Sequence, residues 1–87
     1  MALYKVLIKA SAGKELAAVA SRADRLRLVT RIHGLGSNPR PHGSEKLAGY
    51  DDRYRVRQGN YRVVYLINDE LDEVTIFKIR DRKDVYR

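Results

Sequence analysis

The sequence predicts an α+β fold in the order β-α-α-β-β-β, with two N-terminal helices packed on one face of a small, largely antiparallel twisted sheet. Three observations lead to this prediction. The chain begins with strand-like alternation, its first half carries two stretches with helical spacing, and three alternating runs follow residue 50. With 87 residues, the chain is long enough for one small core, so a single domain over 1–87 is expected.

The first predicted strand covers residues 3–9, where Tyr4, Val6 and Ile8 share one face and two lysines lie beside two leucines on the other. A short helix is expected next. Ser11 is of the residue type that caps a helix N-terminus, and several apolar residues follow it: Leu16, Ala17, Val19 and Ala20.

A second helix is expected after Asp24, which is also a capping residue type. Its apolar positions follow helical spacing: Leu28, Val29, Ile32 and Leu35. Gly34 and Gly36 are expected to end this helix, because glycine readily leaves the helical conformation. The segment 36–44 is rich in glycine and proline, which suit neither helix nor strand, so a loop is predicted there.

Strands are predicted at 53–58, 61–67 and 74–80. Regular alternation in the last of them would turn Phe77 and Ile79 toward the helices and Ile76 toward the opposite face. The acidic cluster between the last two strands is expected to form a turn.

The most distinctive local pattern is the alternation of Arg53, Arg55 and Arg57, which places three guanidinium groups on one face of a strand. Gly59-Asn60 predicts a two-residue hairpin turn, which would place Arg62 opposite Arg57 on the same face. Like charges directly opposed in a sheet are unfavourable. A sheet that gathers cations in this way is expected to bind an anion, and phosphate is the best match.

The overall charge of +7 agrees with a nucleic-acid or acidic protein partner. The absence of cysteine excludes disulfides, a thiolate nucleophile and cysteine-based metal sites. No apolar run approaches the length of a membrane span and no cleavable signal is evident, so a cytoplasmic protein without membrane association is expected.

Four segments together resemble a known family: Lys46-Leu-Ala-Gly49, Tyr54-Arg-Val-Arg57, Gly59-Asn-Tyr-Arg-Val-Val-Tyr65 and Arg80-Asp-Arg-Lys-Asp-Val-Tyr86. In this order and spacing, the chain resembles the RelE/ParE superfamily of bacterial and archaeal toxins, and within it the RelE-like messenger-RNA interferases. The third segment is the most specific of the four. The resemblance implies a RelE-like fold.

The resemblance also implies a function. The chain would be the toxin of a type II toxin–antitoxin system, a ribosome-dependent endoribonuclease that cuts mRNA in the A site and so inhibits translation. Cleavage would proceed by metal-free attack of the 2′-hydroxyl, without a cofactor. The implied partners are the ribosome, mRNA and a cognate antitoxin protein that restrains the toxin.

Five residues are implied to be catalytic: Arg57, Arg62, Arg82, Tyr86 and Lys46. Arg62 matches the arginine that stabilises the transition state, and Arg82, with Arg80 as the alternative, matches the arginine near the leaving oxygen. Tyr86 matches the tyrosine that orients or activates the 2′-hydroxyl. The general base stays open between Lys46, Tyr86 and another group. RNA contacts are expected from five more cations: Arg53, Arg55, Lys78, Arg80 and Lys83.

Alternatives stay open at this point. Tyr54, Tyr61 and Tyr65 alternate with basic residues and could stack on bases, but core packing is the favoured interpretation. His33 and His42 lie near loops and are not expected to bind metal. Two other functions fit the same charge: a ParE-like toxin that inhibits DNA gyrase by binding, and a non-catalytic RNA-binding module.

Overall fold

The computed structural model describes residues 3–81 and confirms the predicted order of elements, with one addition. The elements are β1 (Lys5–Ile8), α1 (Ala10–Ala17), α2 (Arg22–Gly34), β2 (Glu45–Lys46), β3 (Arg53–Gln58), β4 (Tyr61–Asn68) and β5 (Glu73–Asp81). The short strand β2 was not predicted, because two residues are too few to show an alternating pattern.

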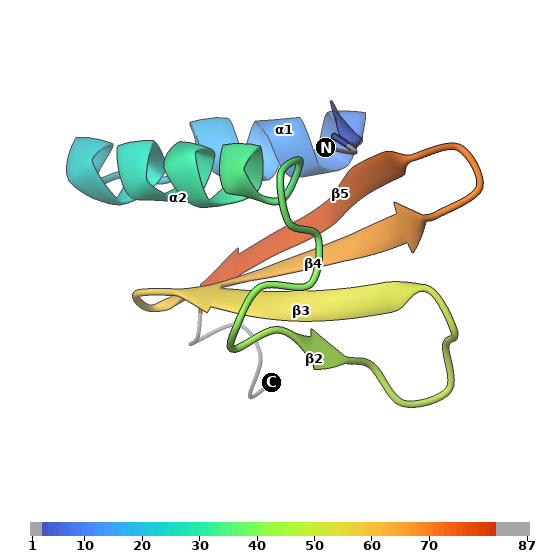
Figure 1. The fold of residues 1–87 in the computed structure, drawn as a ribbon. Helices are drawn as coiled ribbons and strands as arrows, with labels where there is room; N and C mark the ends of the chain where they lie inside the picture. The colour runs from blue at the N-terminus through green and yellow to red at the C-terminus, as the bar shows by residue number, and fades with distance from the viewer. Residues whose placement is uncertain (1–2, 82–87) are drawn as a thin grey trace.

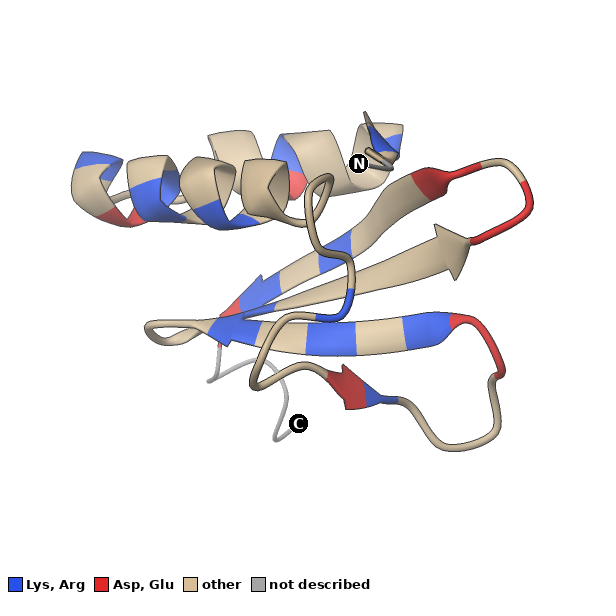
Figure 2. Cartoon of the chain, in the orientation of Figure 1, with Lys and Arg blue, Asp and Glu red and all other residues tan. Residues whose placement is uncertain are grey.

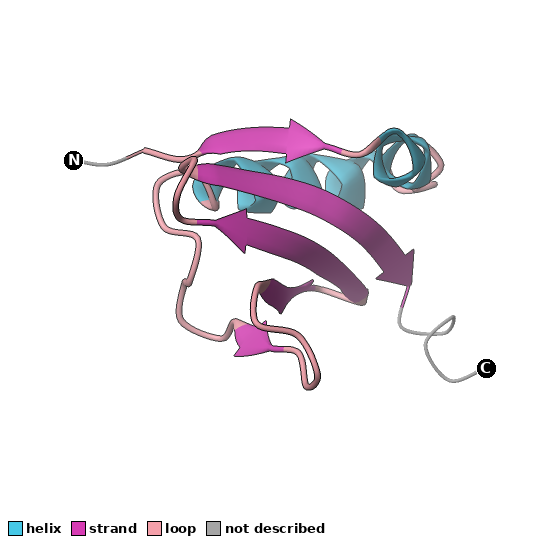
Figure 3. Cartoon of the chain, turned by 90° about the vertical axis from the view of Figure 1, so that its right-hand side faces the viewer, coloured by secondary structure: helices cyan, strands magenta, loops and turns pink. Residues whose placement is uncertain are grey.

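The strands form one sheet in the order β1-β5-β4-β3-β2. The three pairs among β2 to β5 are antiparallel, and β1 pairs with β5 in parallel. Both helices lie on one side of the sheet (Figure 1). A second view shows the strands fanned out by the twist of the sheet (Figure 3). The prediction of a largely antiparallel, twisted sheet covered by helices on one face is therefore confirmed.

The core lies between the helices and the covered face of the sheet. Leu28 and Ile32 of α2 are buried there, and so is Leu35, the C-cap of this helix. Val29 of the same helix is 46% exposed. The sheet contributes seven buried residues: Val56, Val63, Tyr65, Ile67, Val74, Ile76 and Ile79. Tyr65 is fully buried, and Tyr54 and Tyr61 pack against the core. Core packing of these three tyrosines is confirmed.

A β-bulge corrects the predicted faces of β5. Val64 lies opposite Lys78 but the next residue, Tyr65, lies opposite Ile76, so Phe77 is the extra residue of β5. Ile76 and Ile79 therefore both face the core. The prediction that Phe77 faces the helices and Ile76 the other side was wrong, because it assumed uninterrupted alternation along the strand.

The helix starts also differ from prediction. Lys9 is the N-cap of α1 and makes no side-chain capping bond, and Ser11 lies inside the helix. In α2 the N-cap is Ser21, whose hydroxyl accepts a hydrogen bond from the backbone N–H of Asp24 at 3.2 Å. Asp24 instead occupies the first turn, where its negative charge interacts favourably with the positive N-terminal end of the helix dipole.

Gly36 joins the end of α2 to the first strand. Its carbonyl accepts a hydrogen bond from the N–H of Tyr4 at 2.7 Å. A Cβ at this position would lie 3.0 Å from the Tyr4 carbonyl oxygen and 3.1 Å from Val6. The backbones approach so closely that a larger side chain would push them apart.

The loop 36–44 is confirmed and is tied to the sheet by polar contacts. The buried hydroxyl of Tyr65 donates to the Pro39 carbonyl at 2.7 Å. Arg40 forms an ion pair with Asp69 at 2.8 Å and donates to the Tyr54 hydroxyl at 3.2 Å. These contacts hold the loop where it turns toward β2. Among residues 3–81, no helix is long and apolar enough to span a membrane.

Candidate nucleic-acid interface

The β3–β4 hairpin brings two of the predicted site residues together. Gly59 has a φ of 59°, and Asn60 is not among the residues with positive φ, as in a type II′ turn. This two-residue turn places Arg57 directly opposite Arg62. Residues paired in this way share a face, with Cβ atoms about 4.5–5.5 Å apart. The predicted juxtaposition of these two arginines is confirmed.

The uncovered face of the sheet carries a grid of cations around apolar residues. Arg55 and Lys78 lie on either side of Val64, and Arg53 lies beside Leu66 on the same face. Figure 2 shows basic residues at intervals along β3 and toward the end of β5. The predicted clustering of Arg53, Arg55 and Arg57 on one face is confirmed. Their role in RNA binding stays a prediction.

Two of the predicted RNA-binding residues already have anionic partners. Arg55 donates to Glu45 at 2.9 Å, and its side chain is 28% exposed. Arg80 lies opposite Arg62 in the register, but its guanidinium forms an ion pair with Glu15 of α1. An RNA phosphate would have to compete with these carboxylates.

Glu15 is a residue that the sequence prediction missed. Besides binding Arg80, its carboxylate accepts a hydrogen bond from the Ile79 N–H at 3.0 Å. It therefore satisfies a backbone donor of β5 beyond the end of its pairing with β1. Glu15 is the only acidic residue before Asp24, and this isolation is the one sequence feature that could have drawn attention to it.

Lys46 is not brought to the arginine pair. It lies opposite Tyr54, whereas its neighbour Glu45 lies opposite Arg55. Since cross-strand partners share a face, Lys46 lies on the side of Tyr54, and Arg55 and Arg57 lie on the other. The expected grouping of Lys46 with Arg62 is not observed. Arg82, Lys83 and Tyr86 lie outside the described residues.

A hollow of about 30 Å³ at the hairpin is lined by Arg57, Arg62, Gly59, Asn60 and Tyr61. This volume suits about one or two water molecules, so a phosphate group cannot be enclosed there. Among the described residues, this hollow does not surround an anion bound to Arg57 and Arg62.

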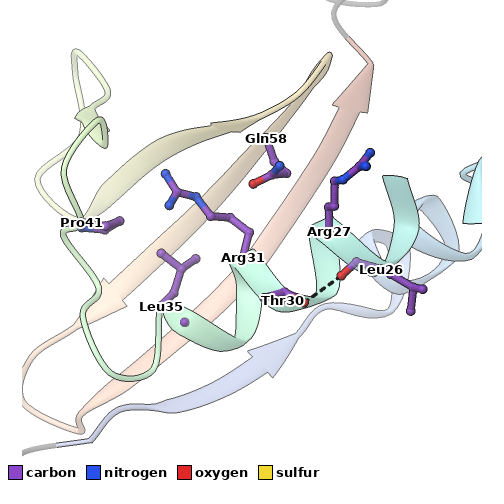
Figure 4. A pocket seen from close by; sticks show the side chains of 8 residues that line it. Leu26, Arg27, Thr30, Arg31, Leu35, Pro41 and Gln58 are labelled. Carbon is purple, nitrogen blue, oxygen red and sulfur yellow. Dashed lines mark hydrogen bonds between the residues drawn. The ribbon is translucent and has the colours of Figure 1, made fainter. Parts of the chain in front are cut away.

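A larger hollow, of about 480 Å³, lies on the helix side of the molecule between α2, the loop and the end of β3 (Figure 4). Arg31 extends across it between Pro41 and Gln58, and its buried Nε has no hydrogen-bond partner in the described part of the chain. Leu26 and Leu35 also line it. No carboxylate or histidine lines this hollow, so it offers a surface for contact rather than acid–base chemistry.

The polar contacts that hold the loop 36–44 and the neighbouring turn shift the pKa values of the groups that make them. The hydrogen bonds from Arg40 and Tyr4 lower the pKa of Asp69 below its usual value. The hydrogen bond to Asp69 in turn raises the pKa of Tyr4. Burial raises the pKa of Tyr65. These groups stabilise the loop, and none belongs to the uncovered face. Within residues 3–81, no three side chains of the metal-binding types gather closely enough to hold a metal ion.

Both the sequence and the fold of this chain are similar to those of known proteins. The sequence matches the family described as the ParE toxin of the type II toxin–antitoxin system parDE over residues 6–86. No curated protein sequence matches significantly.

Solved structures of the same fold are numerous. A chain of the archaeal RelE–RelB complex from Pyrococcus horikoshii OT3 is 31% identical, with a TM-score of 0.81 over 94% of this chain and 97% of that one. A chain of the RelB–RelE complex from Methanococcus jannaschii is 25% identical, with a TM-score of 0.76 over 92% and 94%. A double arginine-to-alanine variant of E. coli RelE in the free state is 25% identical, with a TM-score of 0.77 over 97% and 90%.

The two helices, the five-stranded sheet with its cationic uncovered face, and the match along nearly the whole chain lead to one conclusion: this chain belongs to the RelE/ParE superfamily of type II toxin–antitoxin toxins.

Proposed function

We propose that this toxin is a metal-independent endoribonuclease, an mRNA interferase that cuts mRNA in the ribosomal A site and thereby inhibits translation. The observation that carries the proposal is the pairing of Arg57 with Arg62 on the uncovered face. Two arginines at facing positions present several N–H donors and two positive charges to one anion. The phosphodiester of RNA supplies such an anion, and the planar fork of arginine matches its oxygens.

The reaction needs three groups besides the phosphate. A base removes the proton of the 2′-hydroxyl, whose oxygen forms a bond to phosphorus. The bond from phosphorus to the 5′-oxygen breaks, and an acid protonates that oxygen. The products are a cyclic phosphate and a free 5′-hydroxyl. Cations facing the phosphorus stabilise the charge that develops on its oxygens.

The proposal assigns these tasks to residues of this chain. Arg62, supported by Arg57, faces the developing charge, and Arg82 stabilises the negative charge on the leaving oxygen while water protonates it. Tyr86 orients or activates the 2′-hydroxyl. Lys46 is the other candidate for the base, but the register places it on the face of Tyr54, which favours Tyr86.

The small size of the hollow at the hairpin supports dependence on the ribosome. The hollow at the hairpin is too small to enclose a phosphate, so the described part of the chain holds RNA from one side. Catalysis by orientation requires both reacting groups to be held in a fixed geometry. A ribosome would supply the second side by fixing the mRNA in the decoding site. This partnership implies a cytoplasmic location.

We also propose a cognate antitoxin as partner. Two of the similar structures are complexes of a RelE toxin with a RelB antitoxin. The charge of +7 suits an acidic partner chain. An antitoxin that covered the uncovered face would block access of RNA to Arg57 and Arg62.

The alternative is a toxin that inhibits DNA gyrase by binding. It is favoured by the family description, which names the ParE toxin. Primer-extension mapping of cellular transcripts after induction distinguishes the two. The proposal expects cuts within translated codons that disappear when translation initiation is blocked. Gyrase-linked DNA damage without such cuts would contradict it.

A further inference from the structure

The β-bulge at Phe77 creates a feature that the proposed catalytic residues do not use. Phe77 is only partly buried, although large apolar side chains elsewhere in the same strand are fully enclosed. Its ring is packed against cations of neighbouring segments instead of the helices. The bulge therefore takes an aromatic ring out of the core and places it among charged groups.

Three cations converge on this ring. The Lys9 Nζ lies 4.1 Å from the ring centroid, the Arg53 guanidinium carbon 4.9 Å and the Lys78 Nζ 5.8 Å. Arg53 also lies 4.2 Å from the centroid of the Tyr50 ring, and Tyr50 is 48% exposed. These five residues, Lys9, Tyr50, Arg53, Phe77 and Lys78, are called the Phe77 cluster below. They come from four separate segments, so only the fold assembles them.

The cluster holds positive charge without a carboxylate to balance it. Within residues 3–81, none of its three cations forms an ion pair. By contrast, Arg40, Arg55 and Arg80 each bind a carboxylate. Three like charges gathered around one ring repel one another, although the face of the ring attracts each of them. An anionic ligand would remove the imbalance.

The flat groups of the cluster indicate which anion. Unpaired RNA bases stack on aromatic rings and on guanidinium planes, and the adjoining phosphates bind lysine and arginine. An acidic peptide would use the charges but would have no need of the two rings. The combination of a half-exposed tyrosine, an arginine over its ring and a phenylalanine among lysines fits a nucleotide better.

We propose that the Phe77 cluster is a binding subsite for an unpaired nucleotide of single-stranded RNA. The base stacks on the Tyr50–Arg53–Phe77 surface, and a neighbouring phosphate binds Lys9 or Lys78. The proposal rests on the proposed function in so far as RNA is the substrate. Arg53 and Arg57 are four residues apart on β3, about 13 Å along the strand, so one RNA strand can reach both the cluster and the arginine pair.

The test is direct binding of a labelled, unstructured RNA oligonucleotide to the full chain, followed by fluorescence anisotropy. An Arg62→Ala background prevents cleavage during the measurement. A sugar–phosphate strand of the same length without bases serves as the second ligand. Phe77→Leu keeps an apolar side chain but removes the ring, and Tyr50→Leu does the same at an exposed position that has little effect on folding.

We expect each variant to weaken binding of the RNA about fivefold or more, and to leave binding of the abasic strand unchanged. The matched control is Arg27→Ala, which removes a cation from an exposed position on α2 and should leave the ratio of the two affinities unchanged. Thermal unfolding shows whether each variant is folded. If Phe77→Leu is not, Tyr50→Leu decides the result.

Two results would overturn the inference: equal effects of the variants on both strands, or an effect on binding of a polyglutamate peptide that exceeds the effect on RNA. The test does not depend on cleavage. If transcripts are not cut in cells but base-dependent binding persists, the proposed function fails and this subsite stands. Normal cutting without base-dependent binding would instead contradict the subsite and leave the proposed function intact.

Discussion

The two ends of β3 carry the same residue type in different surroundings. At the hairpin end, Arg57 faces Arg62 across a tight turn, with no aromatic ring among the contacts of Arg57 in residues 3–81. At the other end, Arg53 lies over Tyr50 and beside Phe77. The comparison shows that charge alone does not define a role. Paired guanidinium groups suit the oxygens of a phosphate, whereas a guanidinium on aromatic rings suits a base.

The largest expected effect tests the hairpin end. Arg62→Ala should lower the rate of ribosome-dependent cleavage about 10²–10³-fold, because it removes a preorganised donor facing the developing charge. The rate is measured in single turnovers on ribosomes that carry a defined mRNA. Arg62→Lys, which keeps the charge but loses the planar fork, is the matched variant and should recover only part of the rate. Full activity of Arg62→Ala in a folded protein would remove this residue from the mechanism.

A second prediction separates the two ends kinetically. Arg57→Ala should lower the maximal rate, and Arg53→Ala should raise the concentration needed for half-maximal rate, each by tenfold or more. The difference follows because the first residue is proposed to act on the transition state and the second only on bound RNA. The measurement is the dependence of the cleavage rate on toxin concentration. Identical effects of both variants would show that the two ends are not functionally distinct.

A smaller effect concerns the loop that passes over the covered face. Tyr65→Phe removes the hydrogen bond to the Pro39 carbonyl in a fully buried position, so it should lower the free energy of unfolding by about 1–2 kcal/mol. In a domain of this size, each kcal/mol lowers Tm by about 4–8 °C, which thermal denaturation can detect. Tyr50→Phe, at an exposed position, is the control and should leave Tm nearly unchanged. Cleavage per folded molecule should be unchanged in Tyr65→Phe, since the Tyr65 hydroxyl does not lie at the arginine pair.

The smallest expected effect is on acid stability. Because hydrogen bonds from Arg40 and Tyr4 lower the pKa of Asp69 in the folded state, its contribution to stability is complete above about pH 4 and disappears as the pH falls through the lowered pKa. Asp69→Asn should therefore slightly destabilise the protein at neutral pH and flatten the loss of stability in acid. Denaturation at a series of pH values measures both effects. A similar flattening in Glu70→Gln, at an exposed site in the same turn, would show that Asp69 has no special part.

Much of the fold followed from local patterns in the sequence. Strand β3 was predicted with the bounds that the structure shows, because arginines alternate with apolar residues along it. Strand β4 was predicted to within one residue, because an apolar, β-branched run follows the turn at Gly59. The turn at Gly59 set the register of the hairpin, and that register placed Arg57 opposite Arg62. The sequence also indicated where the core tyrosines lie, since Tyr54, Tyr61 and Tyr65 fall on the apolar side of this register.

Three of the missed features depend on contacts between distant segments. The buried residues Val74, Ile76 and Ile79 break the period of two, and that irregular spacing was the available indication of a bulge. Glu15 and Arg80 are 65 positions apart, so no local pattern could reveal their ion pair. The face of Lys46 depended on β2, a strand of only two residues.

What the sequence alone determined, then, is the order of the elements, the hairpin and the cationic face that it presents, because alternation and turn geometry act over a few neighbouring residues. What only the tertiary structure decided is which cations are balanced and which are not. Arg80 is balanced by a helix packed on the sheet edge, and the Phe77 cluster is assembled from four segments around a bulge. Electrostatic balance depends on distance in space, and folding sets that distance for residues far apart in the chain.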